Sequence, residues 1–302
     1  MGRSFDELFS QLKVVGTKRL AVAVAQDEPV LEAVNEAKDR GIIDAILVGD
    51  KNKIEEIASN IDIDLSKFEI IDECNSQKAT MKAVELVSSG QADMVMKGLV
   101  DTATFLRGVL NKEVGLRTGK LMSHVAVFEV EGIDRLILVT DAAFNTYPDI
   151  KAKTQIINNS VMVAKACGIE CPKVAPVCAV EVVNPDMPAT IDASLLSKMN
   201  DRGQIKGCIV DGPLALDNAL SEEAAQHKGI KGEVAGRADI LLLPNIESAN
   251  VMYKSLTYTA KSRNGGILVG TSAPVILTSR ADSRETKVNS IALAALVSES
   301  NK

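Results

Sequence analysis

The sequence predicts an α/β fold of two lobes, each with a mainly parallel sheet and helices on both of its faces. Short, continuous runs of Val, Ile, Leu and Ala recur along the 302 residues, and amphipathic stretches lie between most of them. Continuous apolar runs are typical of strands buried on both faces, and their alternation with helical stretches is typical of parallel sheets. The expected strands are Leu20–Ala25, Ile42–Val48, Ala92–Met96, Val125–Val130, Leu136–Thr140, Val174–Val182, Ile205–Val210, Ile240–Leu243, Ile267–Val269 and Val275–Leu277.

The first repeat of this alternation shows how each element is predicted. Leu20–Ala25 is apolar throughout, and Pro29 then opens a stretch with apolar residues at helical spacing, as proline does in the first turn of a helix. Gly41 is expected to end that helix, and Ile42–Val48 starts the next strand. A last helix is expected to bury one apolar face, formed by Val288, Ile291, Ala292, Ala295 and Leu296.

The number of strands predicts two lobes. Ten expected strands exceed the roughly five or six of an average sheet. The turn-rich segment Phe144–Asp149 and the Gly-rich segment Asn264–Ser272 are the expected crossing points, so residues 1–139 plus 271–302 form the first lobe and residues 140–270 form the second. Small ligands bind in clefts, and the cleft between two such lobes is the expected site.

Composition excludes several classes of protein. With 34 basic and 40 acidic residues, 3% aromatic residues and no Trp, the chain offers neither a basic field nor a stacking platform for nucleic acid. No apolar run approaches the roughly 18 residues of a membrane helix, and Met1–Lys13 lacks the apolar core of a signal peptide, so a cytoplasmic protein is expected. The five cysteines are expected to be reduced thiols, and no metal site is expected because Cys167 and Cys171 have no histidine nearby.

Common catalytic motifs are absent from the sequence. It contains no G-x-G-x-x-G fingerprint, and Gly115–Lys120 is too short between its glycines to be a phosphate-binding loop. A hydrolase triad would need His124 or His227, but there is no G-x-S-x-G elbow, and His124 is expected to be a buried histidine at a strand edge.

Five segments together resemble the phosphate acetyl/butyryltransferase family over essentially the whole chain, and its butyryl branch more closely than its acetyl branch. They are Met96–Thr102 with Phe105–Gly108, Thr140–Pro148, Val210–Asp217, Ala238–Lys254 and Ala273–Ser283. The resemblance implies reversible transfer of a short acyl group, butyryl preferred, between coenzyme A and inorganic phosphate to give an acyl phosphate. It also implies that coenzyme A is a substrate and that no cofactor or metal takes part. The implied architecture is that of isocitrate and isopropylmalate dehydrogenases, with the site in the interlobe cleft, in a homo-oligomer of two or more chains.

This chemistry needs a cation for phosphate and a base for the thiol, because a thiol of pKa about 8.5 must lose its proton before it attacks. Ser279 and Arg280 follow an expected strand and match the reactive Ser-Arg pair of the family. A guanidinium there can bind two phosphate oxygens at once.

The base is harder to assign. The acetyl branch has an aspartate seven residues after its serine, where this chain has Thr286, which cannot accept the proton. Asp282 is the first alternative and Glu285 the second, although the two also have the spacing of a capping box at the start of the last helix.

Four further residues are expected to bind substrate. Lys97 ends a strand where the acetyl branch has small residues, and we expect it to contact phosphate or acyl phosphate. Arg107 matches a family arginine and is expected to contact the phosphates of coenzyme A, with a solvated helix face as the alternative. Asn145 lies in a turn that lines the expected cleft or acts as its hinge, and Lys254 belongs to a polar helix face with Glu247 and Asn250.

Three alternatives stay open at this point: a phosphate acetyltransferase, an oxidoreductase of the same fold, and a regulatory domain that binds acyl-CoA. Fold alone does not decide between them. An oxidoreductase of this fold needs a cluster of acidic residues to hold a metal, and the sequence contains no such cluster. The presence of Ser279 and Arg280 argues against the regulatory domain.

Overall fold

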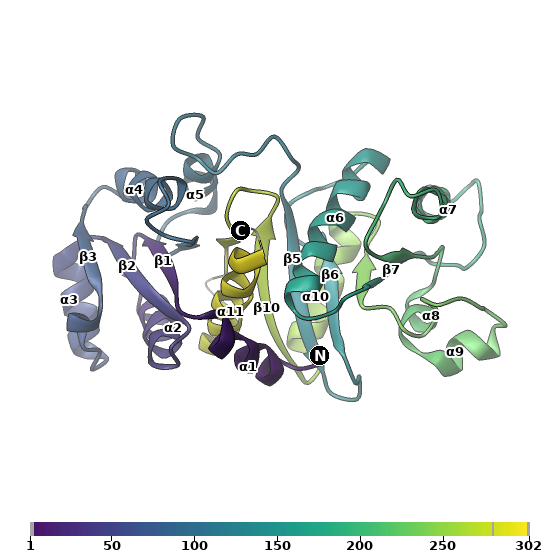
Figure 1. Cartoon of the computed structure of the whole chain (residues 1–302), viewed down its shortest axis with the longest axis horizontal. Coiled ribbons are helices and arrows are strands. Elements are labelled where there is room, and N and C mark those ends of the chain that lie inside the picture. Colours follow the sequence, from purple (N-terminus) through teal and green to yellow (C-terminus); the bar gives the residue numbers. More distant parts are fainter. Residues whose placement is uncertain (1–2, 280, 301–302) are drawn as a thin grey trace. The chain divides into compact units, whose positions relative to one another are not determined.

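The computed structural model describes residues 3–279 and 281–300, and it has the mixed α/β fold with mainly parallel sheets that the sequence predicts (Figure 1). The chain divides into two compact units: unit 1 is Met1–Phe5 with Leu121–Asn264, and unit 2 is Asp6–Lys120 with Gly265–Lys302. In the described part of the chain, no helix is both long and apolar enough to cross a membrane.

The unit boundaries differ from the predicted lobe boundaries after residues 139 and 270. The strands β5 and β6 pair with each other, and β6 also pairs with β9, so the segment that begins at Leu121 packs within unit 1. The sequence alone could not assign this segment to a lobe, because a buried strand has the same continuous apolar pattern in either one.

Unit 2 contains a sheet in the order β3-β2-β1-β4-β11-β10. Its pairs are parallel except for β10 with β11, and the centre is in register at Val22 with both Leu47 and Met96. The strands are β1 (Lys18–Ala23), β2 (Ile43–Gly49), β3 (Glu69–Asp72), β4 (Met94–Lys97), β10 (Ser262–Val269) and β11 (Val275–Ile276).

Several helices of unit 2 pack against this sheet, among them α2 on β2, α4 on β1 and α11 on β11. The predicted last helix is confirmed: it is α11, in which residues 286–298 are all buried, and it packs against α2. The helices are α1 (Phe5–Val15), α2 (Glu28–Asp39), α3 (Lys51–Asn60), the 3-10 turn η1 (Leu65–Lys67), α4 (Ser76–Ser88), α5 (Thr102–Val109) and α11 (Arg284–Ser300).

The edge strand β3 was not predicted. Its sequence, Glu69-Ile-Ile-Asp72, has acidic residues at both ends and no fully buried position, and it pairs with β2 alone among the strands described. An edge strand needs no continuous apolar run, because one of its sides is not covered by another strand.

Unit 1 contains strands in the order β5-β6-β9-β7-β8, of which β5 and β6 are antiparallel and the others parallel. Its core includes Phe128, Ile137 and Leu241, all at most 1% exposed. The elements are β5 (Ser123–Val130), β6 (Leu136–Thr140), α6 (Ile150–Ala166), β7 (Lys173–Pro176), α7 (Pro188–Asp201), β8 (Ile209–Val210), α8 (Leu216–Leu220), α9 (Glu222–His227), β9 (Ile240–Leu242) and α10 (Ile246–Tyr258).

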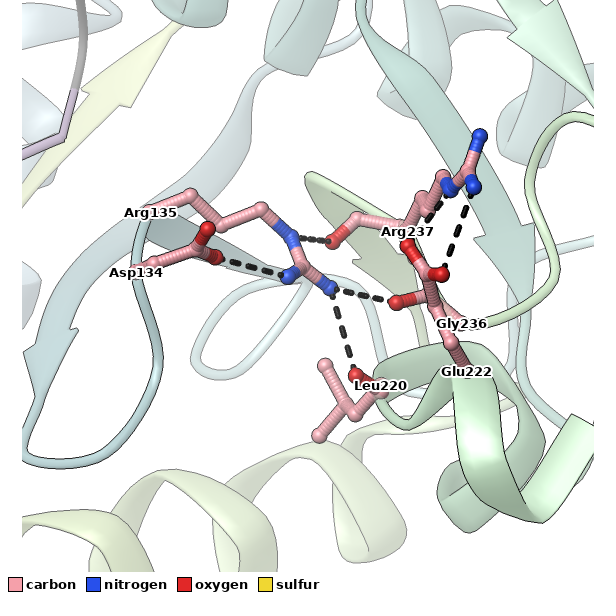
Figure 2. A network of polar contacts seen from close by, with 7 residues as sticks. Asp134, Arg135, Leu220, Glu222, Gly236 and Arg237 are labelled. Carbon is pink, nitrogen blue, oxygen red and sulfur yellow. Dashed lines mark hydrogen bonds and ion pairs between the residues drawn. The ribbon is translucent and has the colours of Figure 1, made fainter.

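A guanidinium ties the helical segment α8–α9 to the start of β9. Figure 2 shows Arg135 directed at backbone carbonyl oxygens: its Nη2 donates to Gly236 O at 3.1 Å and to Leu220 O at 3.4 Å. Its Nε donates to Ala238 O at 3.1 Å. Arginine suits this role because its five N–H groups form a rigid planar fork.

Candidate functional site

The turn after β4 brings a lysine to the carboxyl end of the parallel strands. Lys97 is the last residue of β4 and is 6% exposed. Its Nζ donates to the carbonyl oxygens of Gly98 and Val100, both at 3.2 Å. Ligands of open α/β sheets bind at this end of the strands, so the position fits the predicted substrate contact.

The backbone passes so closely at the next residue that only glycine fits. A Cβ on Gly98 would lie 2.3 Å from Val24 O and 2.7 Å from Ala23 O. The Gly98 N–H donates to Ala23 O at 2.8 Å, and Val24 has φ 57°, a strained value for a β-branched residue. The turn that carries Lys97 is therefore held against the end of β1.

The loop after β11 forms a compact turn around Ser279. The Ser279 N–H donates to Asp282 Oδ2 at 2.7 Å, and the Asp282 N–H donates to Ser279 O at 3.2 Å. The exposed Ser279 Oγ accepts from the Ala281 N–H at 3.3 Å. Arg280 lies outside the described residues.

The capping box expected from Asp282 and Glu285 is wrong. Helix α11 begins at Arg284, and Ser283 caps it: its Oγ accepts from the Thr286 N–H at 3.1 Å. Asp282 precedes the cap, and its carboxylate accepts from the Ser279 N–H instead. Asp282 therefore shapes the loop before the helix, which leaves its predicted role as the base untouched.

A second buried lysine, which the sequence analysis did not single out, lies under this loop. Lys287 is 2% exposed, and its Nζ donates to Asp282 O at 2.5 Å and to Ser279 O at 3.4 Å. Burial lowers the pKa of Lys287, and the carboxylates of Asp282 and Asp27 act in the opposite direction. A signal existed in the sequence, because Lys287 is four residues before Ile291 and so lies on the apolar face of the last helix.

The two lysines line one cavity. It has a volume of about 160 Å³. It brings Lys97 and Ser279, which were predicted as site residues, together with Lys287. The lining residues are Asp27, Pro29, Val30, Lys97, Gly98, Leu99, Thr278, Ser279 and Lys287.

Arg107 does not line this cavity. It is exposed on α5, its Nε donates to Ala103 O at 3.3 Å, and its Nη2 donates to Thr104 Oγ1 at 2.8 Å. Asp101 caps the same helix by accepting from the Thr104 N–H at 2.8 Å. These bonds hold Arg107 along its own helix face.

Unit 1 holds the remaining two predicted residues. Asn145 Nδ2 donates to Asp141 Oδ2 at 2.6 Å and to Met122 O at 2.9 Å, so its side chain is part of the turn after β6. Asp141 is 3% exposed and also accepts from three backbone N–H groups of that turn. Lys254 is half-buried on α10, with its Nζ 5.1 Å from the ring centroid of Tyr253.

Comparison with known proteins identifies the family. Residues 4–81 and 73–295 match the family described as "Phosphate acetyl/butaryl transferase". The chain belongs to this family. The resemblance predicted from five sequence segments is thereby confirmed, and phosphate acyltransferase activity, with acyl-CoA and phosphate as substrates, is the activity of the family.

Relatives of both branches cover almost the entire chain. A phosphate butyryltransferase from Clostridium beijerinckii is 72% identical over 302 residues, which is 100% of both chains. A phosphate acetyltransferase from Thermotoga maritima is 48% identical over 92% of this chain and 95% of its own. The crystal structure of a branched-chain phosphotransacylase from Enterococcus faecalis superposes with a TM-score of 0.84 at 32% identity, covering 93% of this chain and 99% of that one.

Proposed function

We propose that this member of the family transfers a butyryl group reversibly between coenzyme A and inorganic phosphate. One observation carries the choice of acyl group: identity to the C. beijerinckii phosphate butyryltransferase is 72%, against 48% to the T. maritima phosphate acetyltransferase. A phosphate acetyltransferase is the second candidate, because the family contains both.

The reaction sets the demands on the site. In one direction the thiolate of coenzyme A attacks the carbonyl carbon of butyryl phosphate, the C–S bond forms, and the C–O bond to phosphate breaks. Charge develops on the carbonyl oxygen and on the leaving phosphate, so oriented donors and cations accelerate the step. The reverse reaction begins with phosphate attacking the thioester and uses the same groups.

Ser279 and Arg280 are proposed as catalytic residues that hold the phosphoryl group and the developing oxyanion. Ser279 lines the cavity at the carboxyl end of β4, beside a lysine, which supports this role. Arg280 is the next residue and would supply a bidentate cation.

Asp282 is proposed as the base that takes the proton of the thiol. Its carboxylate lies in the same turn as Ser279, with Oδ2 2.7 Å from the Ser279 nitrogen, so a thiol beside Ser279 would be within its reach. Glu285 is a weaker alternative, since it lies in the first turn of α11, beyond the cap.

Lys97, Arg107, Asn145 and Lys254 are proposed to bind substrate. Lys97 has the best support, because it is buried in the lining of the cavity. Arg107 and Lys254 are proposed as contacts for the phosphates of coenzyme A, and Asn145 as a residue that shapes the turn near the acyl group.

The remaining parts of the proposal rest on the family resemblance. They are an architecture like that of isocitrate and isopropylmalate dehydrogenases with the site in the interlobe cleft, a homo-oligomer, a cytoplasmic location, and a reaction in which coenzyme A is a substrate and no metal or cofactor takes part.

The test is a thiol-release assay with acetyl-, propionyl- and butyryl-CoA, each with and without phosphate. We expect release only with phosphate, and the highest kcat/KM with butyryl-CoA. Equal release without phosphate would indicate a hydrolase and refute the proposal, and a preference for acetyl-CoA would favour the second candidate. Hydride transfer to a nicotinamide cofactor, without phosphate-dependent thiol release, would favour an oxidoreductase.

A further inference from the structure

We propose that Lys97 and Lys287 form the phosphate subsite of unit 2, a small pocket that holds inorganic phosphate or the phosphoryl group of an acyl phosphate. The identity of the anion rests on the proposed function. The pocket itself rests on the cavity and on the position of the two lysines. Lys287 is the new assignment, because neither the sequence motifs nor the family comparison singles it out.

The size of the cavity selects a small anion. At about 160 Å³ it is smaller than the roughly 300–1,000 Å³ of pockets for drug-sized ligands, so it is too small for coenzyme A. It has room for several water molecules, and therefore for one tetrahedral oxyanion. A phosphoryl group therefore fits, and the nucleotide part of coenzyme A does not.

The charge of the lining favours an anion. Burying an ammonium group is costly unless it is paired, and two lysines that are 6% and 2% exposed line this cavity. The carboxylate of Asp27 is also in the lining, and the carboxylate of Asp282, outside the lining, acts on Lys287 as well. Lys97 Nζ donates to Gly98 O and Val100 O, and Lys287 Nζ donates to Ser279 O and Asp282 O; these carbonyl oxygens carry only partial charges. A phosphate between the lysines would supply the compensating charge.

Neutral donors add to the two cations. The side chains of Thr278 and Ser279 also line the cavity, and each hydroxyl can donate to a phosphate oxygen. Helix α2, which has twelve residues, begins at Glu28 beside the lining residues Asp27 and Pro29, so the positive end of its dipole faces the same region. These groups support the lysines but would not make a site without them.

Lys287 also connects the pocket to the Ser279 turn. An ammonium group has three donors, and in the described structure two of them are given to Ser279 O and Asp282 O. The third is available to an anion in the cavity. An anion bound to Lys287 would therefore be held directly beside Ser279, where the proposed reaction needs its phosphate.

The experiment compares Lys287→Met and Lys287→Gln with the unchanged chain. Methionine keeps most of the side-chain volume without the charge, and glutamine keeps two N–H donors for the loop carbonyls without the charge. Binding of inorganic phosphate is measured by isothermal titration calorimetry, and the KM values for phosphate and butyryl-CoA are measured in the thiol-release assay. We expect the phosphate Kd and KM to rise about 10- to 100-fold in both variants, because a hydrogen bond to a charged group is lost. The KM for butyryl-CoA should change less than about twofold.

Lys18→Met is the matched control. Lys18 is 5% exposed in the same unit, does not line the cavity, and pairs with Glu299 at 2.5 Å. Replacing Lys18 by Met should leave the Kd and the KM for phosphate unchanged. Lys97→Met tests the pocket from the opposite side and should weaken phosphate binding as Lys287→Met does, even if one of the two variants fails to fold.

The outcomes separate the pocket from the proposed function. If Lys287→Met and Lys97→Met fold and keep the phosphate Kd and KM of the unchanged chain, the proposed pocket is refuted. It is also refuted if Lys287→Gln has the phosphate Kd and KM of the unchanged chain, because Lys287 would then act only by holding the loop carbonyl groups. If the unchanged chain binds phosphate but releases no thiol, the proposed function fails. In that case, loss of calorimetric binding in the lysine variants still supports the pocket.

Discussion

Replacing Asp282 by Asn separates a base from a residue that only shapes the Ser279 turn. The Asp282 carboxylate accepts the Ser279 N–H at 2.7 Å. An amide oxygen can accept the same bond, but without charge assistance. Hydrogen bonds to charged groups contribute about 1.5–3 kcal/mol and neutral ones about 0.5–1.5 kcal/mol, so the turn would lose about 1 kcal/mol. That is about a fivefold change in the population of the ordered turn.

Loss of a base has a much larger effect. General base catalysis contributes about 10²- to 10⁴-fold, so we expect Asp282→Asn to lower kcat by about a hundredfold or more. The assay follows consumption of the coenzyme A thiol with saturating butyryl phosphate, together with thermal unfolding of the same samples. The melting temperature should fall by no more than about 2–4 °C, the shift that a loss of about 1 kcal/mol produces in a chain of this size.

Asp64→Asn is the matched control for this experiment. Asp64 is an exposed aspartate of the same unit whose carboxylate accepts the Ser66 N–H at 2.9 Å, a local backbone bond of the same kind. Its replacement should leave kcat unchanged. A kcat within about fivefold of the unchanged chain in Asp282→Asn would refute the assignment, and would show that Asp282 acts only through the turn.

Four further outcomes are expected. Arg280→Lys keeps a charge but loses the planar fork, so kcat should fall about ten- to a thousandfold, and an unchanged kcat/KM would remove Arg280 from the site. Gly98→Ala places a Cβ 2.3 Å from Val24 O, so we expect a lower melting temperature and a higher KM for phosphate. A variant as stable and as active as the unchanged chain would contradict the close approach. Ser283→Ala removes the cap that accepts the Thr286 N–H, and about 1 kcal/mol of stability should be lost, seen as a melting temperature about 2–4 °C lower and contradicted by an unchanged one. Chelators should leave activity intact, since no cluster of metal-binding side chains is found among the residues that the structure describes, and loss of activity in EDTA that a divalent ion restores would count against this.

The buried parts of the fold could be predicted from sequence, whereas the loops at the site could not. A strand buried on both faces is a continuous apolar run, so Leu136–Thr140 was predicted with the bounds it has. The edge strand β3 was missed because half of its residues are acidic. The cap of α11 was misplaced by one residue, since Asp282 and Ser283 are both good caps and the choice depends on which one the Ser279 N–H engages.

The same contrast holds for the candidate site. Family motifs pointed to Lys97 and Ser279, which the structure brings to one cavity. Lys287 carries no motif, and a lysine in the first turn of a helix usually extends into solvent. Its contacts with the carbonyl oxygens of Ser279 and Asp282 depend on the conformation of the loop, which only the structure gives.

The way unit 2 is assembled from two separate segments affects how it can fold during synthesis. The strand β4 pairs on one side with β1 and on the other with β11, so its second neighbour comes from residues 275–276, after all of Leu121–Asn264 has been made. At about 5–20 residues per second, a ribosome needs roughly 10–40 s to proceed from residue 120 to residue 300. During that time one edge of β4 is uncovered, whereas the segment Leu121–Asn264 can fold first. The nascent chain therefore carries an exposed sheet edge, the kind of surface to which chaperones bind, until β11 has left the ribosome.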